Sequence, residues 1–244
     1  MLIESSVGIM AAARRPSPAH ACQSCDVRAN AICASLDGCA LAELGSLGRR
    51  MTVRSGQTLL WEGDEAALVG NVLTGMLKLS TMTGDGREQI VGVVFPGDFI
   101  GRPFGKDSLQ TVTALTDATV CVFRRNAFDS FAEAHGEIGQ ALLRRTLDEL
   151  DRARRWMLLL GRMSASERVA TLLIELHSRL GHGRSGDTIM LPLSRQQMGD
   201  LLGLTIETVS RTMTRFERAG LIRLPGGRRL EMRNEEELKR IAAG

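Results

Sequence analysis

The stretch that decides the fold lies near the end of the chain, where residues 194–220 read SRQQMGDLLGLTIETVSRTMTRFERAG. Ser194 followed three residues later by Gln197 has the form of a capping box, which predicts the start of a helix. Gly203 stands where a tight turn between two helices needs a permissive backbone, and Thr205 can cap the second helix. The stretch therefore predicts a helix-turn-helix, a unit that places one helix in the major groove of DNA.

The second helix of this unit has two unlike faces. Its apolar residues recur at intervals of three and four, which predicts that they face inward: Ile206, Val209, Met213 and Phe216. Glu207, Ser210 and Arg211 fall on the opposite side, near the end of the helix that meets base edges. Arginine can donate two hydrogen bonds to guanine, glutamate can accept from cytosine, and serine suits a base or a phosphate. We expect these three residues to contact bases, although a solvated charged face would show the same pattern.

Polar and basic residues surround this helix. Apolar residues at 221–232 are interrupted by Pro225, Gly226 and Gly227, which predicts a β-hairpin wing. The side chains that we expect at the DNA backbone are Arg195, Thr205, Arg215 and Arg228. Further arginines of the helix and the wing could also meet phosphates: Arg218, Arg223 and Arg229.

Residues 51–123 have a different texture. Short apolar runs such as 90–95 and 119–123 alternate with turn signals rich in Gly, Asp and Pro, such as 84–86 and 96–98. Short strands separated by frequent turns predict an all-β barrel or jelly roll.

Residues 135–161 then read as one long helix without an internal proline. One face alternates steps of four and three, the spacing of a coiled-coil seam, and we expect it at a dimer interface: Leu143, Thr146, Leu150, Ala153, Met157 and Leu160. A second apolar set, formed by Leu142, Leu147 and Leu158, is expected to pack on the β domain. Taken alone, the seam also fits a helix in the core of one chain, but two apolar faces favour a dimer.

Three of the five cysteines fall within twelve residues, in the pattern Cys22-x₂-Cys25-x₇-Cys33. In a chain without a secretory signal, such a group argues against a disulfide framework. Cys121, in a strand-like run before the long helix, is the fourth candidate ligand. Cys39 is a spare, either a small buried residue or a replacement for Cys33. Four thiolates can hold an iron–sulfur cluster or a zinc ion, and thiols can also form a redox disulfide; the residues leave these alternatives open.

The sequence LLGLTIETVSR at 201–211 resembles the recognition motif of the CRP/FNR family of transcription regulators, specifically its FNR branch. The resemblance extends from Cys22 to about Met232. It implies an α+β fold with an N-terminal cyclic-nucleotide-binding-like β roll, a long dimerisation helix and a C-terminal winged helix-turn-helix. It also implies an oxygen-labile [4Fe–4S] cluster on the four cysteines named above. A homodimer would bind double-stranded DNA of the form TTGAT-N₄-ATCAA through Glu207, Ser210 and Arg211.

The resemblance carries narrower expectations as well. The gap between Cys25 and Cys33 is wider than in the best-known FNR pattern and looks like the variant of α-proteobacterial regulators. In the family, loops such as 83–87 touch RNA polymerase, although an ordinary hairpin tip would look the same. Members that bind cyclic AMP carry a glutamate and a phosphate-binding arginine where this chain has Arg102 and Thr111, so we expect no response to cyclic AMP.

Together these patterns divide the chain into a flexible leader (1–21), a cluster-binding segment with a β-roll sensor domain (22–133), a dimerisation helix (134–162) and a winged helix-turn-helix DNA-binding domain (163–244). The net charge of +3 is compatible with nucleic acid. No apolar run approaches the roughly 20 residues of a membrane span, and no secretory signal is evident, so we expect a cytoplasmic protein without a membrane partner.

No nucleophile–base pair or phosphate loop points to an enzyme. Two alternatives remain. One is the same architecture with another input, such as nitric oxide, zinc or thiol redox, and the other is an iron–sulfur electron-transfer protein.

Overall fold

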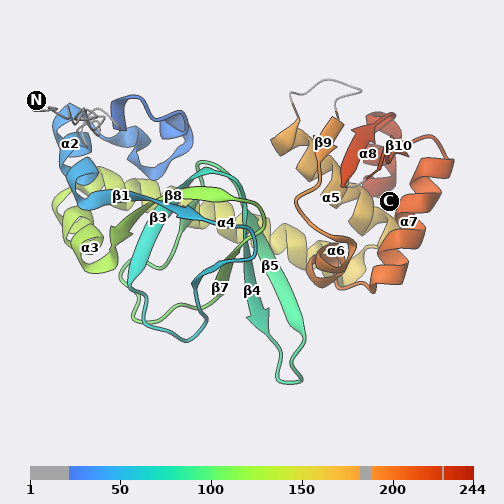
Figure 1. Ribbon diagram of the computed structural model, residues 1–244, viewed down its shortest axis with the longest axis horizontal. Coiled ribbons are helices and arrows are strands. Elements are labelled where there is room, and N and C mark those ends of the chain that lie inside the picture. Colours follow the sequence, from blue (N-terminus) through green and yellow to red (C-terminus); the bar gives the residue numbers. More distant parts are fainter. Residues whose placement is uncertain (1–21, 182–187, 227) are drawn as a thin grey trace, which may run out of the picture.

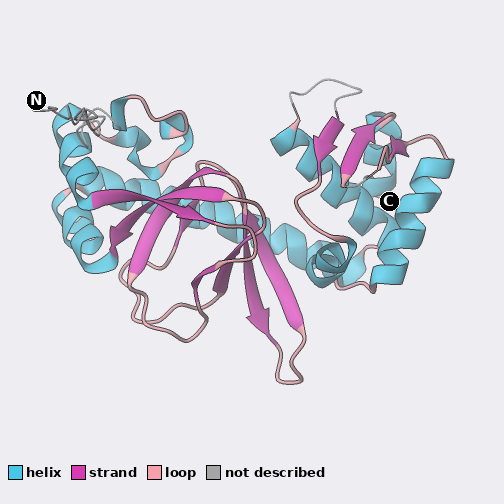
Figure 2. Cartoon of the chain, viewed as in Figure 1, coloured by secondary structure: helices cyan, strands magenta, loops and turns pink. Residues whose placement is uncertain are grey.

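The computed structural model describes residues 22–181, 188–226 and 228–244; the leader expected at 1–21 and Gly227 of the wing lie outside the described residues. The chain forms two bodies joined by the long helix α4 (Gly136–Arg162), which runs behind the first body toward the second (Figure 1). Strands make up most of the first body and helices most of the second (Figure 2). The predicted α+β fold class is confirmed.

The first body contains a roll of two four-stranded antiparallel sheets. One sheet has the order β1 (Gly48–Val53), β8 (Ala118–Arg124), β3 (Leu68–Thr74) and β6 (Phe99–Ile100). The other has the order β2 (Thr58–Leu60), β7 (Thr111–Ala114), β4 (Leu77–Met82) and β5 (Glu88–Val94). Because side chains alternate between the faces of a strand, every second residue enters the roll, where Val72, Leu77 and Val120 are fully buried.

The N-terminal segment and three helices cover the outside of the β1–β8–β3–β6 sheet. Two 3₁₀ turns, η1 (Arg28–Asn30) and η2 (Ile32–Ser35), precede α2 (Gly38–Leu47), and α3 (Arg125–Ala134) follows β8. They enclose a second core that contains Ile32, Leu44, Phe123, Phe128 and Ile138. We call residues 22–36 the cysteine-bearing segment. Since η2 also contacts α4, this segment lies directly against the long helix.

Much of α4 exposes apolar side chains in this single chain. Only Ile138 and Leu159 of the helix are buried, whereas Leu143 is 60% exposed and Met157 is 73% exposed. Thr146, Leu150 and Ala153 are exposed as well, and Leu160 packs partly on the second body. None of the helices in the described parts of the chain, α4 included, is both long and apolar enough to cross a membrane.

The expectation for the second apolar set of α4 was wrong in part. Leu142 packs on the first body, but Leu147 and Leu158 are 52% and 58% exposed. Leu147 stands four residues after Leu143, and Leu158 follows Leu147 by eleven residues, about three full turns, so both turn toward the solvent side that carries Leu143. The seam is therefore wider than the heptad pattern indicated.

The second body is mostly helical. It contains α5 (Ala165–Leu180), β9 (Thr188–Met190), α6 (Arg195–Leu202), α7 (Ile206–Arg218), β10 (Ile222–Arg223), β11 (Arg229–Met232) and α8 (Glu235–Ala243). The strands form one antiparallel sheet in the order β10–β11–β9, so the predicted winged helix-turn-helix is confirmed. Val209, Met213 and Phe216 are buried as expected; Ile206 is 39% exposed, because it opens the first turn of α7 at the edge of the core.

The two bodies are packed together. Ile90 and Phe95 of the roll belong to the same buried cluster as Leu172 and Leu201 of the second body. Gln89 Nε2, in β5, donates a hydrogen bond to the backbone oxygen of Asp200 in α6 at 2.6 Å. The second body thus contacts the roll through β5 as well as being connected to it through α4.

Candidate metal centre and nucleic-acid interface

Cys121 lies on the outer side of the roll, facing the N-terminal segment. It occupies β8 opposite Arg50 of β1, and its side chain packs at the edge of the core around Phe128. A Cβ atom added at Gly48 would lie 3.3 Å from Cys121 Sγ and only 2.7 Å from the Phe123 ring. A glycine at position 48 therefore leaves the room that this thiol and its neighbouring ring occupy.

The other three candidate thiols come from the N-terminal segment. Backbone hydrogen bonds between residues three apart fold this segment into turns: Cys25 N donates to Cys22 O at 3.4 Å and Arg28 N donates to Cys25 O at 3.0 Å. Ile32 is its anchor, with a buried side chain and a backbone N–H that donates to Asn71 Oδ1 at 3.4 Å. Cys22 and Cys33 pack against the same core as Cys121.

Burial and neighbouring thiols raise the pKa values of Cys22, Cys33 and Cys121. Burial, followed by the charges of Cys22, Cys33 and Cys25, raises the pKa of Cys121 to about 12. Burial and then Cys25 likewise raise the pKa of Cys22 and that of Cys33. Arg28 acts in the opposite direction on the pKa of both segment thiols.

Cys39 stands apart from this group. It is exposed on α2 and does not act on the pKa of any of the other thiols. We refer to Cys22, Cys25, Cys33 and Cys121 as the thiol cluster. Cys22, Cys33 and Cys121 thus share one core, Cys25 lies in the same segment as Cys22 and Cys33, and the exposed Cys39 lies on α2; the ligand set stays a prediction.

The spacing of the thiol cluster bears on what it could hold. Within residues 22–181, 188–226 and 228–244, no three His, Cys, Asp or Glu side chains are placed to hold one metal ion. Sulfurs around a single zinc ion must converge on one atom, whereas the four thiolates of a [4Fe–4S] cluster surround a larger cube and stand farther apart. Four cysteine thiolates are the usual donor set of a [4Fe–4S] cluster, and three of these cysteines pack against one core.

The predicted base-reading residues lie on the outer face of α7. Ser194 forms the predicted capping box with Gln197, Gly203 adopts the left-handed conformation at φ 63°, and Thr205 caps α7. Glu207 and Arg211 are exposed and Ser210 is half-buried. The backbone N–H of Glu207 itself, then the Thr205 hydroxyl, then Arg211, hold the pKa of the Glu207 carboxyl below its usual range.

The residues expected at the DNA backbone differ in their surroundings. Arg195 is half-buried, and burial lowers its pKa; its Nη1 lies 3.5 Å from Met198 Sδ. Thr205 already accepts the N–H of Thr208 as a helix cap. Arg215 donates to Ser166, and Arg228 donates to the backbone oxygen of Pro192 at 3.3 Å. The two exposed arginines are thus held at the surface beside α7 and the wing.

Sequence reasoning missed Arg168, at the start of α5. Its guanidinium donates to the backbone oxygens of Leu160 at 2.7 Å, Met163 at 2.9 Å and Leu202 at 2.9 Å. These oxygens lie at the carboxyl ends of α4 and α6, which carry partial negative charge. One side chain therefore joins the long helix to the helix-turn-helix. No local signal marks it, because its partners are distant or belong to the backbone.

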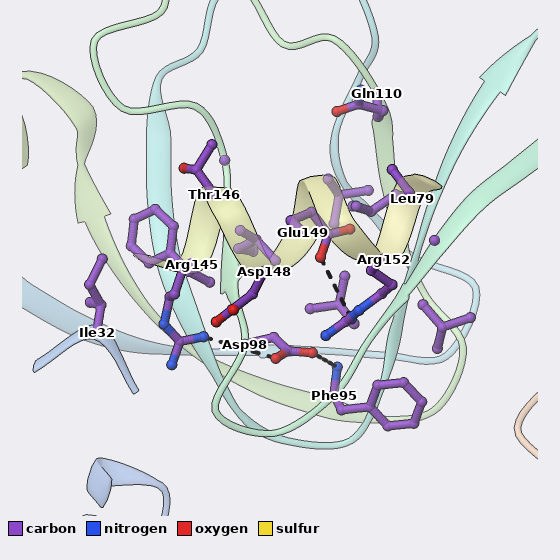
Figure 3. A pocket seen from close by; sticks show the side chains of 18 of the residues that line it. Ile32, Leu79, Phe95, Asp98, Gln110, Arg145, Thr146, Asp148, Glu149 and Arg152 are labelled. Atoms are coloured by element: carbon purple, nitrogen blue, oxygen red, sulfur yellow. Dashed lines mark hydrogen bonds and ion pairs between the residues drawn. The ribbon is translucent and has the colours of Figure 1, made fainter. Parts of the chain in front are cut away.

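A cavity of about 770 Å³ lies between the roll and α4 (Figure 3). Arg102 and Gln110 from the loop after β6 line it, as do charged residues of α4. The α4 arginines already face carboxylates: Arg152 Nη1 lies 3.6 Å from Glu149 Oε2, and Arg145 Nη1 lies 4.0 Å from Asp98 Oδ1.

Comparison with known proteins identifies both halves. Residues 167–241 match the family model described as Crp-like helix-turn-helix domain, and residues 50–135 match the model described as cyclic nucleotide-binding domain. The chain is 43% identical to the transcriptional activator protein FnrL of Cereibacter sphaeroides over 87% of this chain and 88% of the relative. It is 42% identical to the nitrogen fixation regulation protein FixK of Bradyrhizobium diazoefficiens, over 85% and 88%.

Among solved structures, FixK2 from Bradyrhizobium japonicum superposes with a TM-score of 0.76 at 33% identity, covering 81% of this chain and 98% of that one. The match to regulators along most of the chain, with the winged helix-turn-helix in place, agrees with the resemblance seen in residues 201–211. The protein belongs to the CRP/FNR family of transcription regulators.

Proposed function

We propose that this chain activates transcription under oxygen control. A dimer carrying a [4Fe–4S] cluster on each chain binds TTGAT-N₄-ATCAA palindromes, and oxygen lowers that affinity. The observation that carries the proposal is the packing of Cys22 and Cys33 on the same core as Cys121 of the roll, with Cys25 in the same segment, in a chain whose family reads DNA. The description of FnrL as a transcriptional activator supports the direction of control.

Cys22, Cys25, Cys33 and Cys121 would hold the cluster. Bound there, it supplies a centre that oxygen oxidises and degrades. The chain's own part is to release the thiol protons, and because the pKa values of three thiols are raised, assembly weakens as pH falls. Since the segment that brings three of the ligands also packs on α4, its order bears on the helix that we expect at the dimer interface.

The resemblance to the FNR branch favours the cluster over a zinc or a thiol-redox input. Four thiolates could also hold zinc, so iron and sulfide analysis of protein prepared under nitrogen separates these two groups. A metal centre drives the deprotonation of its own thiol ligands, whereas a disulfide switch needs a free thiolate, and burial raises the pKa of the Cys121 thiol to about 12.

Dimer formation is supported by the exposed seam of α4. Contiguous apolar side chains in solvent mark interaction surfaces, and Leu143, Leu150 and Met157 follow coiled-coil spacing along a helix long enough to pair. Two recognition helices combine their binding energies on a palindrome. Glu207, Ser210 and Arg211 would then read each half-site.

We propose that cyclic AMP does not act on this protein. The cavity contains acidic side chains, including Asp148 and Glu149, and its α4 arginines face carboxylates, so a phosphate would have to displace an existing pair. Calorimetry should detect no cyclic-AMP binding at micromolar concentration. For RNA polymerase, the exposed turn at residues 83–87 between β4 and β5 remains our candidate contact.

The central experiment is anaerobic reconstitution with iron and sulfide. The loaded protein should show a broad visible absorbance, about four iron and four sulfide per chain, and tight binding to the palindrome. Air should remove the absorbance and the tight binding together. Unchanged DNA affinity after loss of the cluster would defeat oxygen control, and failure to bind any palindrome would revive an electron-transfer role.

A further inference from the structure

The turn Pro96-Gly97-Asp98, between β5 and β6, touches three parts of the molecule. Gly97 packs on the cysteine-bearing segment so closely that an added Cβ would lie 3.0 Å from the Cβ of Asn30. The Asp98 carboxylate faces Arg145 of α4 and Arg179 of α5. Figure 3 shows Asp98 between Arg145 and the backbone of Phe95.

The roll fixes the position of this carboxylate. Asp98 Oδ2 accepts the N–H of Phe95 at 2.9 Å, and the turn pairs with β3 through Gly97 N to Val72 O at 2.8 Å and Val72 N to Asp98 O at 2.9 Å. Neither carboxylate oxygen can therefore move far without breaking backbone hydrogen bonds. Asp98 is a fixed charge to which mobile side chains can dock.

Each arginine that faces Asp98 has a second anchor. Arg145, whose Nη1 lies 4.0 Å from Asp98 Oδ1, also donates to the backbone oxygen of Asn30, between Cys25 and Cys33. Arg179, whose Nη1 lies 3.6 Å from Asp98 Oδ2, also lies over the Phe95 ring, 4.5 Å from its centre. One arginine thus reaches the cysteine-bearing segment and the other belongs to the DNA-binding half.

These side chains are 27–30% exposed, so each ion pair alone adds little to the stability of the fold. Effectors commonly change each other's affinity by about 5- to 150-fold, so weak pairs such as these can carry coupling only at the lower end of that range, through an element that both sites bias. If Asn30 moved, Arg145 would lose the backbone oxygen to which it donates. Arg145 would then sit differently against Asp98, and the attraction between Asp98 and Arg179 would change.

We propose that Asp98 is a positioning residue that transmits the state of the cysteine-bearing segment to the DNA-binding half. The proposal rests on the proposed function, because that state is the presence or absence of the cluster. Asp98 itself touches neither the thiol cluster nor the DNA-reading face of α7. Its effect is exerted through Arg145 and Arg179.

The test is the ratio of operator affinities of the loaded and the cluster-free protein. Asp98→Asn keeps an acceptor for the Phe95 N–H but loses the charge, and it should lower this ratio at least about threefold, toward one. Asp117→Asn is the matched control, because it likewise removes the charge of a carboxylate that accepts a backbone N–H, that of Ser55 at 2.9 Å, at an exposed site of the roll. The control should leave the ratio unchanged.

A second readout needs no cluster. In the cluster-free protein, Asp98→Asn should speed hydrogen exchange in both residues 28–36 and α5, whereas Asp117→Asn should leave the exchange of both unchanged. If the wild type shows no cluster-dependent affinity, the proposed function fails. If it does and Asp98→Asn keeps the wild-type ratio and exchange, the role of Asp98 is overturned while the function stands.

Discussion

The helix-turn-helix and the cysteine-bearing segment are built in opposite ways. α6 and α7 begin at side-chain caps on Ser194 and Thr205, and their inner faces are almost fully buried. The turns η1 and η2 have no side-chain cap, and Ile32 is their only buried residue. The DNA-reading surface is thus set by local interactions before any ligand binds. The segment depends on what it packs against and, in our proposal, on the cluster that its thiols would hold.

The strongest test of this contrast is Cys25→Ser. If the segment is ordered around a cluster, losing one of four thiolates should abolish the visible absorbance and reduce bound iron close to zero. Unfolding of the cluster-free protein should stay nearly unchanged, because Cys25 is only half-buried and is not among the cysteines that pack on the core. Cys39→Ser is the control and should keep full iron content, since this thiol is exposed on α2. Iron retained by the first variant, or lost by the second, would overturn the ligand set.

The same contrast explains how far the sequence could lead. Capping boxes, a left-handed glycine and a period of three and four act over a few residues, so the caps and the turn of the helix-turn-helix were predictable to the residue, whereas the exposure of Ile206 was not. The spacing of Cys22, Cys25 and Cys33 was visible as well, but their approach to Cys121 needed the pairing of β8 with β1 and β3.

Other features were out of reach of a sequence pattern. The solvent side of Leu147 and Leu158 depends on how α4 is rotated against the roll, which periodicity leaves undetermined. Arg168 binds backbone oxygens, which carry no sequence identity. Asp98 meets residues 47 and 81 positions away in the chain.

Arg168→Ala should give the next largest effect, a loss of stability in the second body, whose structure is set before any ligand binds. Its charged guanidinium serves three backbone oxygens, so we expect a loss of about 3 kcal/mol in the free energy of unfolding. Arg168→Lys should recover only part, because a point charge cannot reach all three. Urea unfolding of cluster-free protein measures both. Arg162, the last residue of α4, is exposed, and Arg162→Ala should lower the free energy of unfolding by less than about 0.5 kcal/mol. A loss as large as that of Arg168→Ala would remove the special role of Arg168.

Arg211→Ala tests whether the pre-built surface reads bases. Binding to the palindrome should weaken by about 1–3 kcal/mol, while binding to random DNA changes little. Arg218→Ala, at the far end of α7, is the comparison, because loss of a phosphate contact weakens both DNAs alike and lowers the salt dependence. Titrations of both DNAs at several salt concentrations separate these patterns. Equal losses for Arg211→Ala on the two DNAs would assign Arg211 to the backbone.

The smallest expected effect is the pH dependence of stability that burial and neighbouring thiols give to Cys121 in the cluster-free protein. The pKa of Cys121 is raised from 9.0 to about 12. Between these values the folded chain keeps a proton that the unfolded chain releases, so stability is lost as pH rises from about 9 toward 12. Between about pH 8 and about pH 10, urea unfolding should show the wild type losing about 1 kcal/mol more than Cys121→Ala. Cys39→Ala should follow the wild type. An identical pH dependence in Cys121→Ala would mean that neither burial nor the neighbouring thiols raise the pKa of Cys121 in the folded chain.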